Sequence, residues 1–158
     1  MSSPKAAVFV CASMQEGQNC PTDMMMYYDW RPGTAFNGLF DFYSSAPIWG
    51  YWALYSWGKL KTLGTQIRAE CDIPDVRVTA ARDNEGHLGV LVSRYTLDDN
   101  VTSNRNVTVR LASGSFGSSV RCHITDRFNM YTEYPVALQP DGTLILGLEP
   151  DSFVFIEL

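Results

Sequence analysis

Two stretches in the first half of the chain have the spacing of hydrophobic residues that is typical of helices. The first, PKAAVFVCASMQEG, covers residues 4–17. Ser3 precedes it as a natural N-cap, and Pro4 suits the first helical position. Its middle is apolar almost all round, which predicts that it is covered on more than one side. The second helix is predicted over about 47–63, with Gly64 after its last residue.

Between these helices lies TDMMMYYD, residues 22–29, which has the character of a strand. Both of its faces are hydrophobic, with Met24, Met26 and Tyr28 on one side and Met25 and Tyr27 on the other. A strand buried on both faces normally lies in a parallel sheet covered by helices. This chain offers it no parallel partner, and a lone strand leaves backbone groups unpaired on both edges. The pattern therefore indicates a piece of a larger β/α unit.

The second half of the chain is predicted to be all-β. Seven short segments have alternating or β-branched character, at residues 76–83, 87–96, 105–112, 119–126, 130–136, 143–148 and 152–157. Turn sequences such as Asp-Asn-Glu-Gly at 83–86 and Pro-Asp-Gly at 140–142 lie between them. Short strands at this regular spacing predict an antiparallel β-sandwich.

The aromatic residues indicate where the two halves meet. Residues 1–68 hold 13 of the 20 aromatic residues, including all four tryptophans. We therefore predict a helix-strand-helix part at 1–68 and a β-sandwich domain at 69–158. The predicted fold class is mainly β with α.

Composition narrows the range of functions. With 46% hydrophobic and 18% charged residues, the chain has the balance of a globular protein. A net charge of −5 argues against nucleic acid and against a polybasic membrane anchor, because both need clustered cations. Apolar runs are too short for a membrane span. The N-terminus is a poor signal peptide, and the four cysteines lack metal-site spacing, which favours reduced, mostly buried thiols in a cytoplasmic protein.

The first half resembles a known family of enzymes. The run MMMYYDWRP…FNGLFDFYSSAPIWGYWALYSWGKLKTLGTQI is similar to the C-terminal end of glycoside hydrolase family 39 and related retaining enzymes, most strongly over residues 20–67. The resemblance implies the seventh helix, eighth strand and eighth helix of a (β/α)8 barrel, followed by the β-sandwich. In such barrels the loops after the strands build the active site.

The resemblance also implies where the catalytic groups lie. Retaining enzymes of this class use two carboxylates, which in the family are glutamates at the ends of the fourth and seventh barrel strands. Glu16 is the only glutamate in the first 69 residues and matches neither position. We therefore predict that the chain supplies no catalytic residue and does not hydrolyse glycosides alone.

The predicted substrate contacts lie where the strand ends and its loop begins. Tyr28, Asp29, Trp30, Arg31, Phe36 and Asn37 are the candidates, as hydrogen-bonding groups or as walls of a sugar subsite. Alternatively, Asp29 and Arg31 form a structural pair and the aromatic residues simply pack.

Other groups are expected to be structural. The aromatic residues of the second helix are assigned to packing rather than to a sugar platform. His87 and His123 have no partner at metal-ligand spacing, and Asp98-Asp99-Asn100 reads as a polar hairpin rather than a calcium loop. No cofactor or metal is expected.

Two further functions stay open. The chain could be a non-catalytic carbohydrate-binding sandwich, although that half is poor in the aromatic residues that stack on sugars. It could also be a structural protein that self-associates through the exposed faces of the first helix and the strand. The expected partners are thus a carbohydrate, in the complete enzyme, and further copies of the chain.

Overall fold

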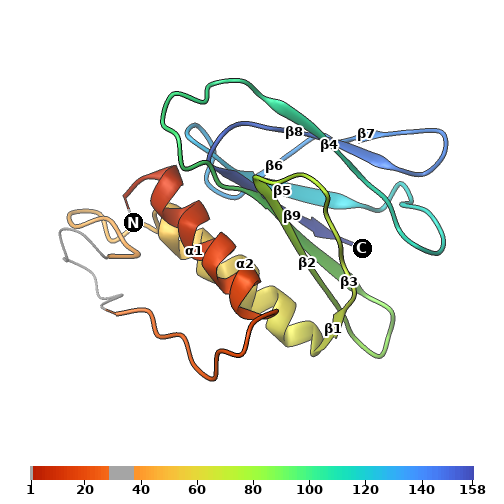
Figure 1. The fold of residues 1–158 in the computed structure, drawn as a ribbon, viewed down its shortest axis with the longest axis horizontal. Helices are drawn as coiled ribbons and strands as arrows, with labels where there is room; N and C mark the ends of the chain where they lie inside the picture. Colours follow the sequence, from red (N-terminus) through yellow and green to blue (C-terminus); the bar gives the residue numbers. More distant parts are fainter. Residues whose placement is uncertain (1, 29–37) are drawn as a thin grey trace.

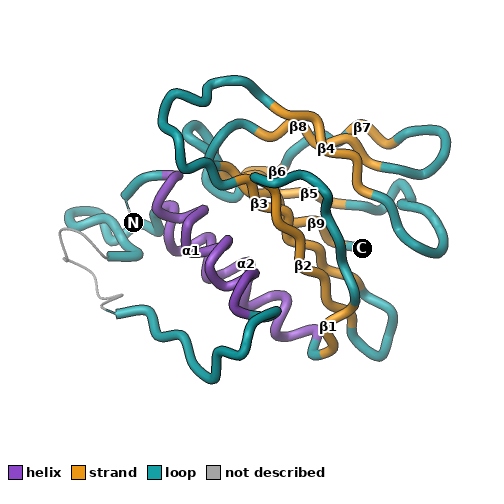
Figure 2. The backbone as a smooth tube through the Cα atoms, in the orientation of Figure 1, coloured by secondary structure: helices purple, strands orange, loops and turns teal. Residues whose placement is uncertain are grey.

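The computed structural model describes residues 2–28 and 38–158, and it places them in three layers (Figures 1 and 2). Helix α1 (Pro4–Gly17) and helix α2 (Trp49–Leu63) lie side by side against a six-stranded antiparallel sheet. A three-stranded antiparallel sheet covers the opposite face of that sheet. The chain is therefore mainly β with two helices. In the described part of the chain, neither helix is long and apolar enough to cross a membrane.

The six-stranded sheet has the order β1-β2-β3-β9-β5-β6, and the three-stranded sheet has the order β4-β8-β7. Their bounds are β1 Thr65–Ile67, β2 Val76–Arg82, β3 Leu88–Arg94, β4 Arg105–Val109, β5 Arg121–Thr125, β6 Thr132–Glu133, β7 Ala137–Leu138, β8 Leu144–Leu148 and β9 Ser152–Glu157. All neighbouring strands are antiparallel. Each of the seven predicted segments contributes a strand to one of the sheets.

The six-stranded sheet is buried on both faces, because the side chains of its central strands alternate between two cores. On β3, Val92 faces the three-stranded sheet and Leu91 faces the helices. On β9, Val154 and Phe155 divide in the same way. All four side chains are at most 1% exposed. Burial on both faces, which the sequence suggested for a parallel strand at 22–29, thus occurs in antiparallel strands between helices and a second sheet.

Helix α1 forms where the sequence predicts it. The Ser3 side chain accepts a hydrogen bond from the Ala6 amide, as an N-cap does. Ala7 and Cys11 are fully buried, whereas Phe9 is 53% exposed. The helix is therefore covered mainly on one side in the described chain, rather than on more than one side as predicted.

The apolar residues whose helical spacing predicts α2, namely Ile48, Trp52, Tyr55 and Leu63, do not form its buried stripe. The sequence pattern emphasised its large residues, but the buried positions hold Gly50, Ala53, Ser56 and Leu60. Trp49, Trp52 and Trp57 are only partly buried, and they pack against the core that Ala53 and Leu60 share with α1 and the sheet. Gly64 ends the helix with φ of 86°, a left-handed conformation that glycine adopts without strain.

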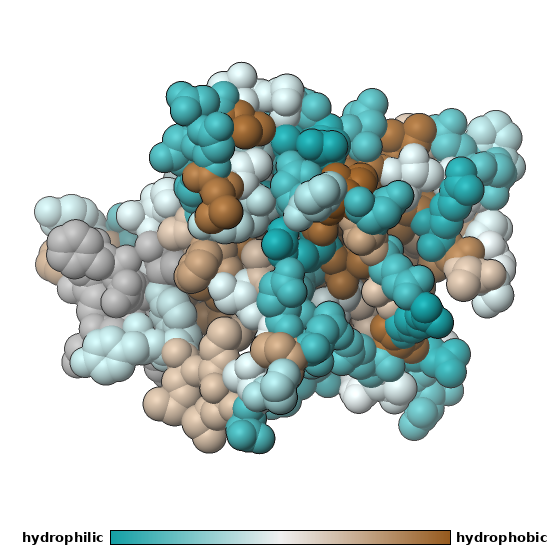
Figure 3. Space-filling view, viewed as in Figure 1, coloured by the Kyte–Doolittle hydropathy of each residue, from teal (hydrophilic) through white to brown (hydrophobic). Residues whose placement is uncertain are grey.

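The predicted strand at 22–29 is not formed over its described residues, 22–28. Residues 22–28 are without regular secondary structure, and Met24, Met26 and Tyr28 are 74%, 79% and 80% exposed. A strand is stable only when neighbours take up its backbone hydrogen bonds, and no described strand lies beside this segment. The segment runs along the outside below the helices, where Figure 3 shows apolar side chains on the surface.

Three smaller expectations also need correction. Only Thr132–Glu133 of the predicted strand at 130–136 is a strand, and the chain then moves to the other sheet as β7. Strand β1 was not predicted, and it pairs with β2 across the expected boundary at 68/69. Residues 98–100 lie on a connection between two sheets, so they do not form the predicted hairpin.

Candidate functional site

Of the six predicted substrate-contacting residues, the structure describes one. Tyr28 is exposed and lies at the end of the irregular segment that follows α1. Asp29, Trp30, Arg31, Phe36 and Asn37 lie outside the described residues. Their roles in sugar binding stay predictions.

A column of stacked rings lies between α2 and the edge of the six-stranded sheet. The Tyr131 ring stacks on Trp52, with centroids 5.1 Å apart and planes at 11°, and on His123, at 4.4 Å and 5°. Tyr55 meets Tyr131 edge-on at 5.1 Å. The backbone of Tyr131 has φ of 56°, which is uncommon for a residue with a side chain. The strain indicates that packing fixes this ring in place.

Polar atoms in this column are buried without a described partner. They are Trp52 Nε1, His123 Nδ1 and the Tyr131 hydroxyl. Burial raises the pKa of Tyr131. Burial and the nearby charge of Lys59 lower the pKa of His123. Because Tyr131 stacks with two rings, it offers no open face for sugar stacking, which supports the structural interpretation of these aromatic residues.

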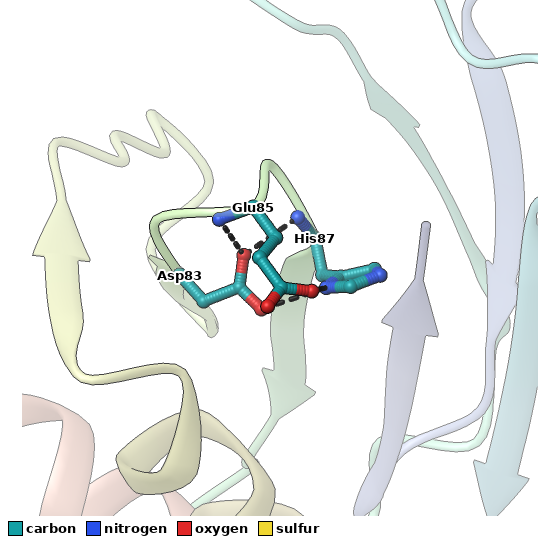
Figure 4. A group of neighbouring side chains, drawn as sticks. All are labelled: Asp83, Glu85 and His87. Atoms are coloured by element: carbon teal, nitrogen blue, oxygen red, sulfur yellow. Dashed lines mark hydrogen bonds and ion pairs between the residues drawn. The ribbon is translucent and has the colours of Figure 1, made fainter.

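A second group comprises Asp83, Glu85 and His87 in the turn between β2 and β3 (Figure 4). One atom of each lies within 4.8 Å of the others, a set of ligand types that divalent cations accept. Asp83 Oδ1 accepts hydrogen bonds from the amides of Glu85 and His87, and Asp83 Oδ2 lies 2.7 Å from His87 Nδ1. The sequence analysis missed this grouping, although the spacing of i, i+2 and i+4 across a tight turn could have indicated it.

The charges in this turn stabilise one another. The hydrogen bond from His87 holds the pKa of Asp83 below its ordinary value, and the same bond raises the pKa of His87. The side chains of Glu85 and His87 are largely exposed. These hydrogen bonds hold the three residues together as a turn. This is the kind of structural role that the sequence predicts for His87.

Other candidate groups have structural partners. Glu16 forms an ion pair with Arg77, with Oε1 2.8 Å from Nε. Asp98 Oδ1 accepts hydrogen bonds from the amide and the side chain of Asn100, which is a local turn. Of the four free cysteines, Cys11 and Cys122 are buried, whereas Cys20 and Cys71 are exposed. Two of the four thiols are therefore buried, fewer than the sequence analysis expected.

Comparison with known proteins places the fold. No protein-family model matches the sequence, and no curated protein matches it. Solved structures do match. A glycoside hydrolase family 30 subfamily 8 xylanase from Clostridium acetobutylicum has a TM-score of 0.72 at 13% identity, over 99% of this chain and 39% of that one. The catalytic domain of family 30 xylanase C from Talaromyces cellulolyticus gives 0.70 at 17%, over 99% and 36%.

A glucosidase from Croceicoccus marinus matches with a TM-score of 0.68 at 16% identity, over 98% of this chain and 42% of that one. The chain thus spans about two fifths of the length of these structures. Since each identity is below 25%, the likeness concerns the fold. These neighbours do not support family 39, because the two xylanases belong to family 30. The chain has a fold that occurs in glycoside hydrolases.

Proposed function

We propose that the chain is the C-terminal part of a retaining glycoside hydrolase that acts on a β-linked glycoside of the xylan type. In this proposal residues 1–68 are the last helix, strand and helix of a (β/α)8 barrel, and residues 69–158 are its β-sandwich. One observation carries the proposal: the alignment to the xylanase covers 99% of the chain, so the helix pair and both sheets superpose together. A free-standing binding module would be expected to match through its sheets alone.

The chemistry of retention indicates which part of the proposed enzyme holds the catalytic groups. Retention needs an acid/base and a nucleophilic carboxylate about 5–5.5 Å apart. Within the described chain, Glu16 is bound to Arg77, and Asp83 is held by the turn that includes His87. In the proposed enzyme both catalytic carboxylates lie on barrel strands outside this part. The chain then contributes the loop after the eighth strand to the substrate-side wall, and the sandwich braces the barrel.

The activity of the purified chain is the first test. We expect no release of aryl alcohol from aryl β-xylosides or β-glucosides and no reducing sugar from xylan, with a family 30 xylanase as the positive control. Turnover that disappears when a carboxylate of this chain is replaced, for example in Glu16→Gln, would contradict the proposal. Sequencing the DNA before the Met1 codon is the second test. About 600 in-frame bases would reach most of a barrel of roughly 250 residues, and we expect them to encode strand-end glutamates.

A binding experiment separates the proposal from the carbohydrate-binding alternative. Titration calorimetry of the purified chain with xylo-oligosaccharides and cello-oligosaccharides should give no heat of binding, because a subsite needs several barrel loops at once. Saturable heat of binding to either sugar would favour a binding module instead.

We also propose that the isolated chain self-associates through the segment after α1. Its Met24, Met26 and Tyr28 side chains are exposed, and clustered apolar surface promotes association. Light scattering should show a mass above 17.7 kDa that falls when the three residues are replaced by serine. A monomer at all concentrations would contradict this.

A further inference from the structure

The unpaired polar atoms of the interior are concentrated in one place, the ring column of Trp52, Tyr131 and His123. In the described chain, four buried side-chain nitrogen or oxygen atoms have no hydrogen-bond partner, and this column holds three of them. A polar group that is buried without a partner favours any state in which water can reach it. The strained backbone of Tyr131, with φ of 56°, also favours release of that residue. Ring packing therefore holds the column closed against an opposing cost.

Tyr131 is the joint of this column, because its ring lies between Trp52 of α2 and His123 of β5. It belongs to the turn between β5 and β6. Strand β6 has only two residues and lies at the end of the six-stranded sheet, where it pairs with β5 alone. Few backbone hydrogen bonds therefore hold the segment that carries the Tyr131 ring.

A second contact joins α2 to the same turn and does not depend on the column. Trp49 Nε1 donates to the Asp126 carbonyl oxygen at 2.6 Å. The Asp126 side chain accepts hydrogen bonds from the amides of Phe128 and Asn129, which hold the turn in shape. Neither an indole N–H nor a backbone carbonyl changes its charge with pH. This contact is therefore a fixed point beside the ring column.

The charges that face His123 come from three elements. Lys59 of α2 and Arg121 of β5 are cations near the imidazole, and Glu133, its partner on β6, is the anion. Glu157 of β9 is bound to both Lys59 and Arg121, so its charge is already matched. Burial and the charge of Lys59 lower the pKa of His123. A proton on this half-buried ring thus adds a third positive charge beside two others.

We propose that the ring column is an acid-sensitive latch, in which protonation of His123 releases the Tyr131 ring and exposes the Trp52 indole to water. The rest of the contact between α2 and the sheet stays closed, because the buried residues of α2 include no titratable group. An imidazolium is also attracted to an aromatic face, but here desolvation and repulsion outweigh that attraction. The inference uses only contacts within the described chain and does not depend on the proposed enzyme function.

The indole hydrogen of Trp52 reports the state of the latch in ¹⁵N–¹H spectra of the full chain. The four tryptophans give four indole signals, which single Trp→Phe variants assign. As the pH falls below about 6.5, we expect exchange of the Trp52 indole hydrogen with water to accelerate by up to about tenfold per pH unit, since one proton drives the opening. The rate is measured relative to that of Trp49, whose indole hydrogen stays bonded to Asp126.

Variants identify the group that drives the opening. His123→Asn should remove the pH response, whereas the matched control His87→Asn, in the turn between β2 and β3, should keep it. Lys59→Gln removes a repulsive charge and should move the response to higher pH, and Glu133→Gln removes an attractive one and should move it to lower pH. Circular dichroism at neutral pH confirms that each variant folds.

Four results would overturn the proposal. One is a relative exchange rate of the Trp52 indole that does not change with pH, and another is the same change in His123→Asn. Slower exchange in acid would mean that the attraction between imidazolium and Tyr131 tightens the stack. Loss of protection at Trp49 together with loss of the far-ultraviolet circular dichroism would mean that acid unfolds the whole chain rather than the latch.

Discussion

Replacing Arg94 by methionine tests what joins the two sheets. Arg94 lies at the end of β3, and its side chain is 1% exposed. Its Nε donates to Asp75 Oδ2 at 2.8 Å, and its Nη1 donates to the carbonyl oxygens of Ser103 at 2.8 Å and Leu148 at 2.9 Å. Since Leu148 ends β8, this guanidinium links the six-stranded sheet to the three-stranded sheet.

The size of the effect follows from what the substitution leaves behind. Arg94→Met fills much of the volume of the arginine. It leaves the Asp75 carboxylate and the carbonyl groups of Ser103 and Leu148 without their hydrogen-bond donor. Breaking a buried ion pair costs about 3–5 kcal/mol, and an unpaired buried acceptor costs about 1–3 kcal/mol. These costs overlap, and Asp75 is 22% exposed and keeps Arg105 at 3.2 Å, so water and a second cation relieve part of the loss. We expect the free energy of unfolding to fall by about 3–4 kcal/mol.

Urea unfolding followed by tryptophan fluorescence measures this loss. The control is Arg127→Met, because Arg127 Nε is also 2.8 Å from a carboxylate, that of Glu149, but its side chain is 65% exposed. An exposed pair contributes about 0–1 kcal/mol, so the control should scarcely move the midpoint. A loss for Arg94→Met no larger than that of the control would refute the argument that burial decides the strength of this contact.

The acid dependence supplies an independent check. Burial opposes ionisation of Asp75, but the hydrogen bond and charge of Arg94 outweigh it, so the pKa of Asp75 lies below its ordinary value. A lowered carboxylate pKa contributes stability above about pH 4, and this contribution is lost as the pH falls through the folded-state pKa. Arg94→Met should flatten that part of the stability profile. Asp75→Asn added to Arg94→Met should restore part of the loss, because no unpaired carboxylate remains.

Three further predictions concern the helix–sheet contact and the two histidines. A Cβ at Gly89 would lie 2.8 Å from Leu63 Cδ1, so Gly89→Val should push α2 outward and lower the free energy of unfolding by about 1–3 kcal/mol. Thermal unfolding measures this loss. The control is Gly58→Ala, whose added Cβ meets nothing within 4 Å and which should be neutral or stabilising. The lowered pKa of His123 means that protonation opposes folding, so wild type should lose stability relative to His123→Asn as the pH falls below about 6.5. The raised pKa of His87 means that protonation favours folding. Wild type should therefore be more stable than His87→Asn below about pH 6.5, and this extra stability should vanish as the pH rises through the folded-state pKa. Profiles with the same slope for both variants would contradict these assignments.

Local signals in the sequence predicted the elements well. Ser3, Pro4 and Gly64 mark helix ends by backbone chemistry that acts within one turn, and both helices form there. The alternation in the second half likewise predicted β-structure in all seven segments. These features depend on neighbours in the chain, which a sequence displays directly.

Features that depend on distant neighbours were not predicted. The stack of Trp52, His123 and Tyr131 joins residues almost 80 positions apart, and none of them has a local motif. Gln15 is 2% exposed and donates to the Leu91 carbonyl on β3, a contact that its place in a helical pattern does not reveal. In α2 both the aromatic residues and the small residues recur at helical spacing, so the sequence pattern does not show which of the two faces is buried.

Two parts of the molecule have the sequence pattern or the backbone of a strand without a described strand beside them. Residues 22–28 have the two-sided apolar pattern of a buried strand, but their Met24, Met26 and Tyr28 side chains are exposed beside the helices. The edge of β4 is the converse, a sheet and an apolar groove without a strand. The helices and the three-stranded sheet lie on opposite faces of the six-stranded sheet, so the segment and the groove of one chain are separated by that layer (Figure 1). Under the proposed function, the rest of the barrel would supply neighbouring strands to residues 22–28.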